Sequence, residues 1–120
     1  MVVGVGGLGC ASSAYLAMAG VGSLRLVDGD SVARSNLGRQ VLYSDADVGR
    51  AKVEAAAERL RAMNPAIEVE GICAFADRTN FASMLEGVDV VVDGTDSLGA
   101  RRLLNRALVT LGKPVIVTSC

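Results

Sequence analysis

A glycine-rich turn lies directly after the first apolar run of the chain. Residues 1–3 (MVV) precede residues 4–9 (GVGGLG), a small-residue helix is expected over residues 9–19, and Asp28 follows the next apolar run. Glycines allow a tight turn and close approach of a ligand, and the helix N-terminus attracts phosphate. An acidic residue after the second strand can accept hydrogen bonds from a ribose. The pattern predicts a nucleotide-binding strand–helix–strand unit; the alternative is a glycine turn that serves only helix–sheet packing.

Composition favours one soluble domain with an aliphatic core. The 120 residues are 51% hydrophobic and 3% aromatic, and the formal net charge is −1. A bulk basic surface for nucleic acid is therefore not expected. The cysteines Cys10, Cys73 and Cys120 have neither zinc-pair nor disulfide-framework spacing, which suits a reducing cytoplasm. Cys10 lies near a helix start, where a reactive thiol is possible, but a buried small side chain is the favoured role.

The uncharged first 24 residues allow a second interpretation. Residues 17–19 (AMA) resemble a signal-peptidase site. A secretory signal is disfavoured because no basic region precedes the apolar run and glycines interrupt it. Apolar runs elsewhere have strand length, so no membrane span is expected.

Apolar β-branched runs alternate with helical patterns along the whole chain. Strands are predicted at residues 2–5, 24–27, 68–74, 88–92 and 114–117, and helices at 9–19, 50–63, 80–86 and 98–111. The fold class is therefore α/β, a Rossmann-like doubly wound, mostly parallel sheet of about five strands in a single domain over residues 1–120. The outer strands lie so close to both ends of the sequence that a chain truncated at both ends is expected.

The segment between Asp28 and Lys52 is too long and polar for an ordinary strand-to-helix turn. Its candidate ligand-binding side chains are Ser35, Asn36, Arg39 and Lys52. A guanidinium and an ammonium together suit the grip on a polyphosphate. Each residue also has a structural alternative: salt-bridged cations for Arg39 and Lys52, a local Asx turn for Asn36, and backbone bonding for Gln40.

Carboxylates follow the fourth predicted strand in residues 93–97 (DGTDS). Asp96 at a strand end is suitably placed to carry Mg²⁺ bound to a triphosphate. The alternative is that Asp96 or Ser97 caps the helix that begins near Leu98, and both roles can coexist. Because the glycine turn, Asp28 and residues 93–96 all follow strand ends, they are expected to face one crevice.

Together these motifs resemble the ThiF/MoeB/HesA family, relatives of the ubiquitin-activating enzymes. The resemblance extends in order over almost the whole chain. It rests on residues 4–10 (GVGGLGC), 28–30 (DGD), 35–40 (SNLGRQ), 44–52 (SDADVGRAK), 64–65 (NP) and 93–96 (DGTD). The serine–asparagine–leucine–x–arginine–glutamine element with its downstream lysine is far more specific than the glycine motif. MoeB and ThiF, which activate sulfur carriers, look nearest.

The resemblance implies adenylation of the C-terminal glycine of a ubiquitin-like sulfur-carrier protein by ATP and Mg²⁺, in a cytoplasmic homodimer. By position, Gly7 would lie against the nucleotide and Asp28 would bind the ribose. Asp96 would bind Mg²⁺, and Ser97 takes the place of a nucleotide-contacting asparagine. The phosphate-holding residues would be Ser35, Asn36, Arg39 and Lys52, of which Arg39 and Lys52, with Asp96, would be catalytic.

Several departures from the family pattern limit which functional roles the resemblance implies for this chain. Ser97 could weaken a nucleotide contact that asparagine makes in many members. An N-terminal arginine that reaches a neighbouring subunit's ATP, the zinc-binding cysteine pairs and the reactive cysteine have no counterpart in this sequence, and Cys120 does not match the last of these. ATP binding is therefore easier to predict for these residues than complete catalysis.

Two other classes of function stay open from the sequence. An NAD-dependent oxidoreductase would use the glycine turn and Asp28 but leaves Asn36, Arg39 and Lys52 unexplained, and the chain has no histidine to serve as a hydride-transfer acid. A non-catalytic nucleotide-binding or interaction fragment of an activating enzyme is the other alternative. A related tRNA-modifying dehydratase would also adenylate, but the charge gives no indication of RNA.

Overall fold

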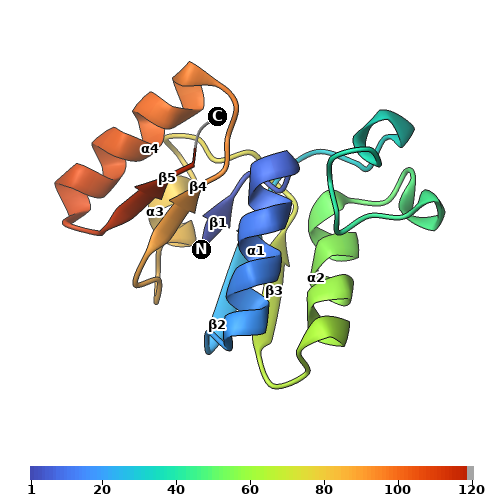
Figure 1. Ribbon diagram of the computed structural model, residues 1–120. Coiled ribbons are helices and arrows are strands. Elements are labelled where there is room, and N and C mark those ends of the chain that lie inside the picture. Colours follow the sequence, from blue (N-terminus) through green and yellow to red (C-terminus); the bar gives the residue numbers. More distant parts are fainter. Residues whose placement is uncertain (119–120) are drawn as a thin grey trace.

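Five short parallel strands form one sheet, in the order β3-β2-β1-β4-β5 (Figure 1). The computed structural model describes residues 1–118, so Cys120 lies outside the described residues. The strands are β1 (Val2–Val3), β2 (Ser23–Val27), β3 (Glu68–Ile72), β4 (Val91–Asp93) and β5 (Val115–Val117). The strand order reverses direction between β1 and β4. This is the doubly wound, Rossmann-like arrangement, so the predicted fold class is confirmed.

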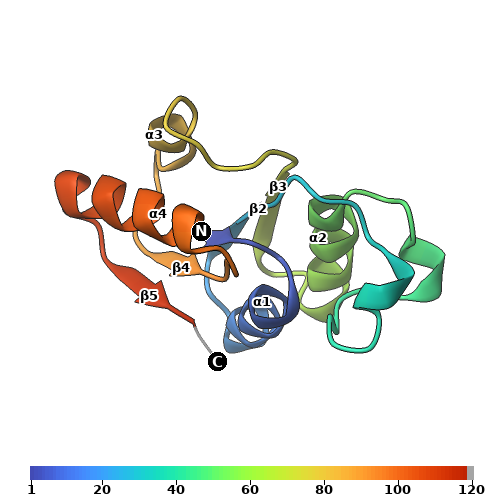
Figure 2. The ribbon, with the colours of Figure 1, turned by 90° about the horizontal axis from the view of Figure 1, so that it is seen from above.

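Helices cover both faces of the sheet (Figure 2). They are α1 (Gly7–Ala19), α2 (Lys52–Met63), α3 (Phe81–Met84) and α4 (Leu98–Leu111). α1 and α2 pack on one face around a core that includes Val5, Leu26 and Leu60, and α3 and α4 pack on the other around Val91 and Leu104. The central strands β1 and β4 are buried on both faces, which explains why the sequence is apolar there, whereas the outer strands β3 and β5 are partly exposed. No helix among residues 1–118 is long and apolar enough to cross a membrane.

The boundaries of some elements differ from the predicted ones. The glycine turn itself enters the helix, so α1 begins at Gly7 and β1 ends at Val3. The predicted helix over residues 80–86 shortens to one turn, and Val88 joins the following turn because its N–H donates to the carbonyl of Leu85. β4 consequently begins at Val91 instead of residue 88. The predicted boundaries of α3 and β4 are wrong because local turn hydrogen bonds replace the helical and strand hydrogen bonds there.

The segment between β2 and α2 is closed by a short antiparallel clip. Ser31 forms a β-bridge with Ala51, and the Val32 N–H donates to the Arg50 carbonyl at 2.8 Å. The clip explains why α2 begins at Lys52 instead of residue 50. Between its two arms, the chain makes two 3₁₀ turns, Arg34–Asn36 and Asp45–Asp47. The clip brings the beginning and the end of this polar segment together beside the carboxyl end of β2.

Candidate nucleotide-binding site

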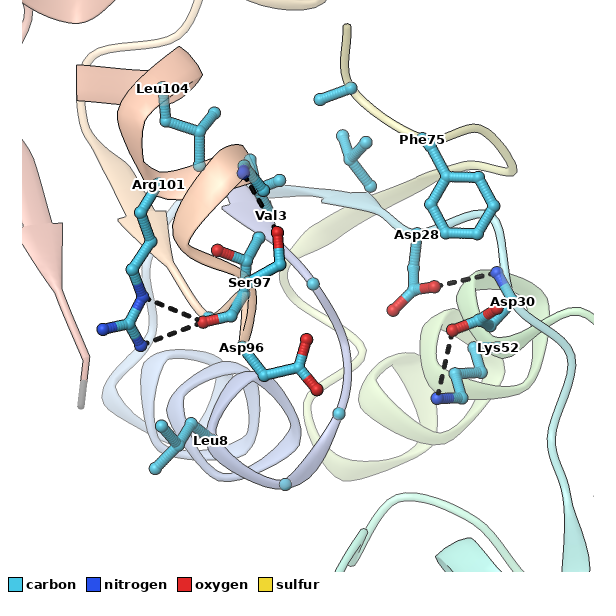
Figure 3. Close-up of a pocket in the computed structure, with 18 of the residues that line it drawn as sticks. Val3, Leu8, Asp28, Asp30, Lys52, Phe75, Asp96, Ser97, Arg101 and Leu104 are labelled. Carbon is cyan, nitrogen blue, oxygen red and sulfur yellow. Dashed lines mark hydrogen bonds and ion pairs between the residues drawn. The ribbon is translucent and has the colours of Figure 1, made fainter. Parts of the chain in front are cut away.

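A cleft of about 930 Å³ opens at the carboxyl ends of the strands, where the strand order reverses (Figure 3). Its size suits a ligand as large as a nucleotide. It lies between the glycine turn, the β2–α2 segment and the β4–α4 turn. Seven predicted site residues line it: Gly7, Asp28, Asn36, Arg39, Lys52, Asp96 and Ser97. Ser35 is exposed and does not line the cleft.

The glycines of the turn divide into two groups. A Cβ at Gly9 would lie 1.8 Å from the Gly4 carbonyl oxygen, and one at Gly94 would lie 2.7 Å from the same atom. These three glycines are therefore required for the close crossing of β1, α1 and β4. Gly6 and Gly7 have no such clash, and they line the cleft, as Gly4 and Gly94 also do, where their missing side chains leave room for a ligand. Helix–sheet packing and ligand access thus coexist in one motif.

The N-terminus of α1 faces this cleft without a side-chain cap. Gly6 is its N-cap residue, and the first turn contains no acidic side chain. The first N–H groups of a helix have no partner within the helix, and they carry the positive end of the helix dipole. The arrangement favours an anion at Gly6 and Gly7.

Asp28 joins the glycine turn to the β2–α2 segment. Its Oδ2 accepts a hydrogen bond from the Val5 N–H at 2.8 Å, and its Oδ1 accepts one from the Asp30 N–H at 2.8 Å. The residue is only 8% exposed, yet it lines the cleft. Each carboxylate oxygen has a second lone pair, so Asp28 can also accept a hydrogen bond from a ligand hydroxyl.

Lys52 is a buried cation at the start of α2. The residue is 7% exposed, and its Nζ lies 3.9 Å from Asp30 Oδ2, whose side chain is 60% exposed (Figure 3). A positive charge is disfavoured at a helix N-terminus because the dipole end there is also positive. The sequence alternative of an exposed helix lysine is therefore wrong, whereas its pairing with an acid is confirmed. A buried, weakly paired ammonium that lines a cleft is suited to bind an anion.

Arg39 and Asn36 also reach the cleft from the β2–α2 segment. Arg39 is exposed, and its Nη1 donates only to the Ser35 carbonyl, at 3.1 Å, among the described residues. Neither Asp45 nor Asp47 forms an ion pair with it; their partners are Arg34 and Arg50. Asn36 is buried and accepts a hydrogen bond from the Ala33 N–H, which agrees with the local-turn alternative. Arg39 is thus positioned to turn its guanidinium toward a ligand.

On the opposite side of the cleft, the turn between β4 and α4 carries Asp96. Ser97 caps α4 by accepting the Ala100 N–H at 3.0 Å, so the capping alternative holds for Ser97. Asp96 is exposed and takes no part in that cap. Asp93 cannot supply a second free carboxylate because Oδ1 accepts hydrogen bonds from Thr95 and Oδ2 lies 4.0 Å from Arg101 Nε. Asp96 is the carboxylate that this turn offers to a ligand or metal.

Three charged or aromatic residues that line the cleft, Asp30, Arg101 and Phe75, were not selected as site residues from the sequence. Asp30 pairs with Lys52, and Arg101 donates twice to the Thr95 carbonyl (Figure 3). Arg101 also donates once to the Thr118 carbonyl. Phe75, 64% exposed, packs on Gly29, where a Cβ would lie 2.6 Å from its ring. The closeness of Asp30 to Asp28 in the sequence could have indicated that Asp30 lies at the cleft. Arg101 and Phe75 gave none, because both reach the cleft only through tertiary packing.

Cys10 lies beneath this cleft as a buried side chain. It is 0% exposed, and burial raises the pKa of its thiol, which opposes formation of a reactive thiolate. Its Sγ and the Tyr43 hydroxyl both donate to the Val5 carbonyl. Cys10 therefore supports the glycine turn from below, in agreement with the favoured structural role.

Comparison with known proteins identifies relatives over the whole chain. The model of the ThiF family matches residues 1–120. The chain is 45% identical over 116 residues to the molybdopterin-synthase adenylyltransferase of Escherichia coli (strain K12), a match that covers 97% of this chain and 47% of the relative. It is 47% identical over 116 residues to the SAMP-activating enzyme E1 of Haloferax volcanii, covering 97% and 43%. The chain thus spans about half the length of the curated relatives it matches.

Solved structures agree with these sequence relatives. The E. coli tRNA N6-threonylcarbamoyladenosine dehydratase TcdA in complex with ATP superimposes with a TM-score of 0.93 at 33% identity, over 99% of this chain and 49% of that chain. The E. coli MccB complex with AMPCPP and MccA gives a TM-score of 0.85 at 32% identity, over 98% and 35%. Both the family model and these structures span the sheet and the cleft, and the chain belongs to the ThiF family.

Proposed function

We propose that this chain is the ATP-binding, adenylating unit of an enzyme that activates the C-terminal glycine of a ubiquitin-like sulfur-carrier protein. The observation that carries the proposal is Lys52, a buried ammonium in a nucleotide-sized cleft, whose ion-pair partner within residues 1–118 is one exposed carboxylate at 3.9 Å. A polyphosphate would provide the negative charge that the fold itself supplies poorly at this place.

The relatives support ATP as the nucleotide and a protein as the acceptor. TcdA was crystallised with ATP, and the MccB complex holds AMPCPP together with MccA. The E. coli relative at 45% identity is named a molybdopterin-synthase adenylyltransferase, and the archaeal relative a SAMP-activating enzyme E1. TcdA, named for a tRNA-modifying activity, is 33% identical. The higher identities favour a protein acceptor over RNA.

The proposed reaction requires no protein nucleophile. A carboxylate oxygen of the acceptor attacks the α-phosphorus of ATP, the bond from that phosphorus to the oxygen bridging the β-phosphate breaks, and pyrophosphate leaves with the electron pair. The protein orients the reactants and stabilises charge on the phosphoryl groups. Arg39 and Lys52 would hold the phosphates, Asp28 would accept from the ribose, and Gly7 would face the nucleotide. Ser35 would act through its carbonyl contact with Arg39.

The side chains present fit a magnesium ion that arrives with ATP. Mg²⁺ keeps several waters and takes one or two carboxylates together with substrate phosphates. Asp96 is an exposed carboxylate in the cleft, and Asp93 is engaged elsewhere. Asp96 would hold the ion, which when bound neutralises part of the phosphate charge. Ser97, as the cap of α4, would fix the direction in which Asp96 leaves the turn.

The setting of the whole enzyme is part of the same proposal. We infer a cytoplasmic homodimer whose further residues complete the groove for the carrier protein, since the matched relatives are about twice as long as this chain. Of the alternatives, an NAD-dependent oxidoreductase predicts a different ligand for the cleft, an interaction fragment predicts no nucleotide there, and a non-catalytic nucleotide-binding fragment would bind ATP without adenylating an acceptor.

Titration calorimetry of the chain with ATP and Mg²⁺ tests the proposal, with NAD as comparator and Arg39→Ala as the variant. We expect magnesium-dependent ATP binding that the Arg39→Ala change weakens by about tenfold or more, because a charge-assisted contact is lost. Tight NAD binding that ignores Arg39 would favour the oxidoreductase instead. Binding of neither nucleotide would contradict the proposal and favour a non-catalytic interaction fragment.

A further inference from the structure

Helix α1 presents an uncharged face to solvent. Its thirteen residues (GLGCASSAYLAMA) include no acidic or basic side chain. Leu8, Ser12 and Tyr15 follow one another at intervals of four and three residues, so they share one face of the helix. Tyr15 is 72% exposed. Because the exposed face of a surface helix normally carries charged and polar residues, this face is expected to have a partner.

This face of α1 is turned toward β5. Figure 3 shows Leu8 on the side of α1 that lies toward Arg101 and away from Lys52. Arg101 donates to the carbonyl of Thr118, the residue that follows β5. The uncharged face of α1 and strand β5 therefore border the same part of the molecular surface (Figure 2).

On the side of the sheet where α1 packs, β5 has no cover. Val92 of β4 belongs to the core under α1 and α2, and Ile116 of β5 is its register partner, so both side chains point to that side. Val92 is buried, but Ile116 is 56% exposed, and Val90, two residues before Val92, is exposed too. No helix of residues 1–118 lies over β5 on this side (Figure 1).

The winding of the chain explains why β5 is bare there. Right-handed crossovers place α1 and α2 on the face that covers β1, β2 and β3, and α3 and α4 on the opposite face. A further right-handed crossover from β5 to a parallel strand beyond it would place its helix beside α4. A helix of that pattern does not reach Ile116, so the cover has to come from elsewhere.

We propose that a second copy of this chain covers this surface, which consists of Leu8, Ser12 and Tyr15 on α1 together with Val90 and Ile116 on the sheet. The inference rests on the proposed function, because it gives the contact face of the homodimer proposed there. In a two-fold dimer the same surface of both copies meets, and a charge near the axis would face its own like charge. A surface without charges avoids that repulsion, so it suits a second copy better than a charged partner.

The dimensions of the surface suit a dimer contact. A specific interface buries about 800 Å² on each partner, with aromatic anchors near its centre. Tyr15 alone would bury on the order of 150 Å², about a fifth of that area. α1, with 13 residues, is about 20 Å long, so a second copy that lies along it also contacts Leu8 at one end and Ile116 on the adjoining strand.

Size-exclusion chromatography with light scattering tests the proposal on the 120-residue chain. At micromolar concentrations we expect a dimer. Tyr15→Glu and Ile116→Glu should each weaken dimerisation by at least about tenfold, since each brings two like charges together in an apolar contact. Val109→Glu is the matched control, which should leave dimerisation unchanged. Val109 is 73% exposed but lies on α4, which packs on the opposite face of the sheet.

Circular dichroism shows whether each variant is folded, and Tyr15→Ser provides an uncharged variant that should also weaken the dimer. A monomeric wild type overturns the inference. So does a dimer that persists in the variants of Tyr15 and Ile116, or one that Val109→Glu weakens equally. Calorimetry with MgATP reports on the cleft separately. A monomeric wild type that binds MgATP overturns this inference but not ATP binding, whereas a dimer of the expected behaviour that binds no MgATP overturns the proposed function alone.

Discussion

At the scale of single residues, the lysines show how differently one side chain can be used. Lys113 Nζ donates to the Val88 carbonyl at 2.5 Å and ties the residues after α4 to the turn between α3 and β4. Lys52 is buried beside a helix N-terminus and lies 3.9 Å from its carboxylate partner. The first contact stabilises the fold. The second leaves a charge that a bound anion would satisfy.

Replacement of each lysine by methionine tests this contrast. For Lys52→Met we expect an unchanged or higher Tm, because a poorly compensated buried charge is replaced by an apolar chain of similar length. Its Kd for MgATP should rise by about one to two orders of magnitude with the loss of a charged contact. Lys113→Met, the control, should lower Tm and leave the Kd unchanged. Thermal unfolding measures the Tm of each variant, and calorimetry measures its Kd for MgATP. A large loss of Tm in Lys52→Met with normal ATP affinity would contradict the role of Lys52 as an anion-binding residue.

At the scale of elements, the crossing of β1, α1 and β4 depends on backbone contact. The Gly4 carbonyl points at Gly9 and Gly94, and neither position has room for a Cβ. Gly4 itself has a φ of +85°, which a side chain would strain. The two strands at which the sheet order reverses can therefore lie beside the start of α1. The cleft exists because of this close approach.

Gly9→Ala is expected to disrupt that crossing. The added methyl would lie 1.8 Å from a backbone oxygen, so β1 and α1 must separate, at a cost of about 3 kcal/mol or more in the free energy of unfolding. Gly22→Ala is the matched control, since nothing lies within 4 Å of its Cβ position. Urea unfolding measures both variants. Equal stabilities would show that the crossing can relax, contrary to the structure.

At the scale of the whole molecule, a sheet with two cores carries a polar segment at one edge of the cleft. Val32, Leu42 and Tyr43 anchor that segment in the hydrophobic core, and its own hydrogen bonds fix its polar turns. Asp47 accepts from the Ser44 N–H and hydroxyl, at 2.8 and 3.0 Å, and from Arg50 at 2.9 Å. The backbone hydrogen bond from Ser44, aided by the hydroxyl and Arg50, lowers the pKa of Asp47 below its ordinary value.

Because of the lowered pKa of Asp47, the stability of the whole protein depends on pH in the acid range. Because the folded-state pKa lies below the unfolded value of about 3.9, the contribution of Asp47 is complete above that value and is lost as pH falls through the folded pKa. Asp47→Asn should therefore lower Tm at pH 7, and its difference from wild type should shrink below about pH 4. Asp45→Asn, which alters an exposed ion pair with Arg34, should have a smaller effect. Thermal unfolding from pH 7 to 3 measures the Tm of both variants and of the wild type. If the Tm difference between Asp47→Asn and the wild type stayed constant over this range, the lowered pKa of Asp47 would not contribute to stability, contrary to the prediction.

The alternation of apolar strands with helices, and the polar residues at strand ends, determined the parallel sheet and the position of the cleft. These are local properties, since side-chain periodicity and glycine turns depend on neighbouring residues. Asp28, Arg39, Lys52 and Asp96 could be selected in this way. Only the tertiary structure decided that Lys52 is buried and that Gln40 Oε1 has no partner among the described residues. Burial and hydrogen-bond partners are set by segments far apart in sequence, such as Asp30 beside Lys52, and periodicity carries no information about them.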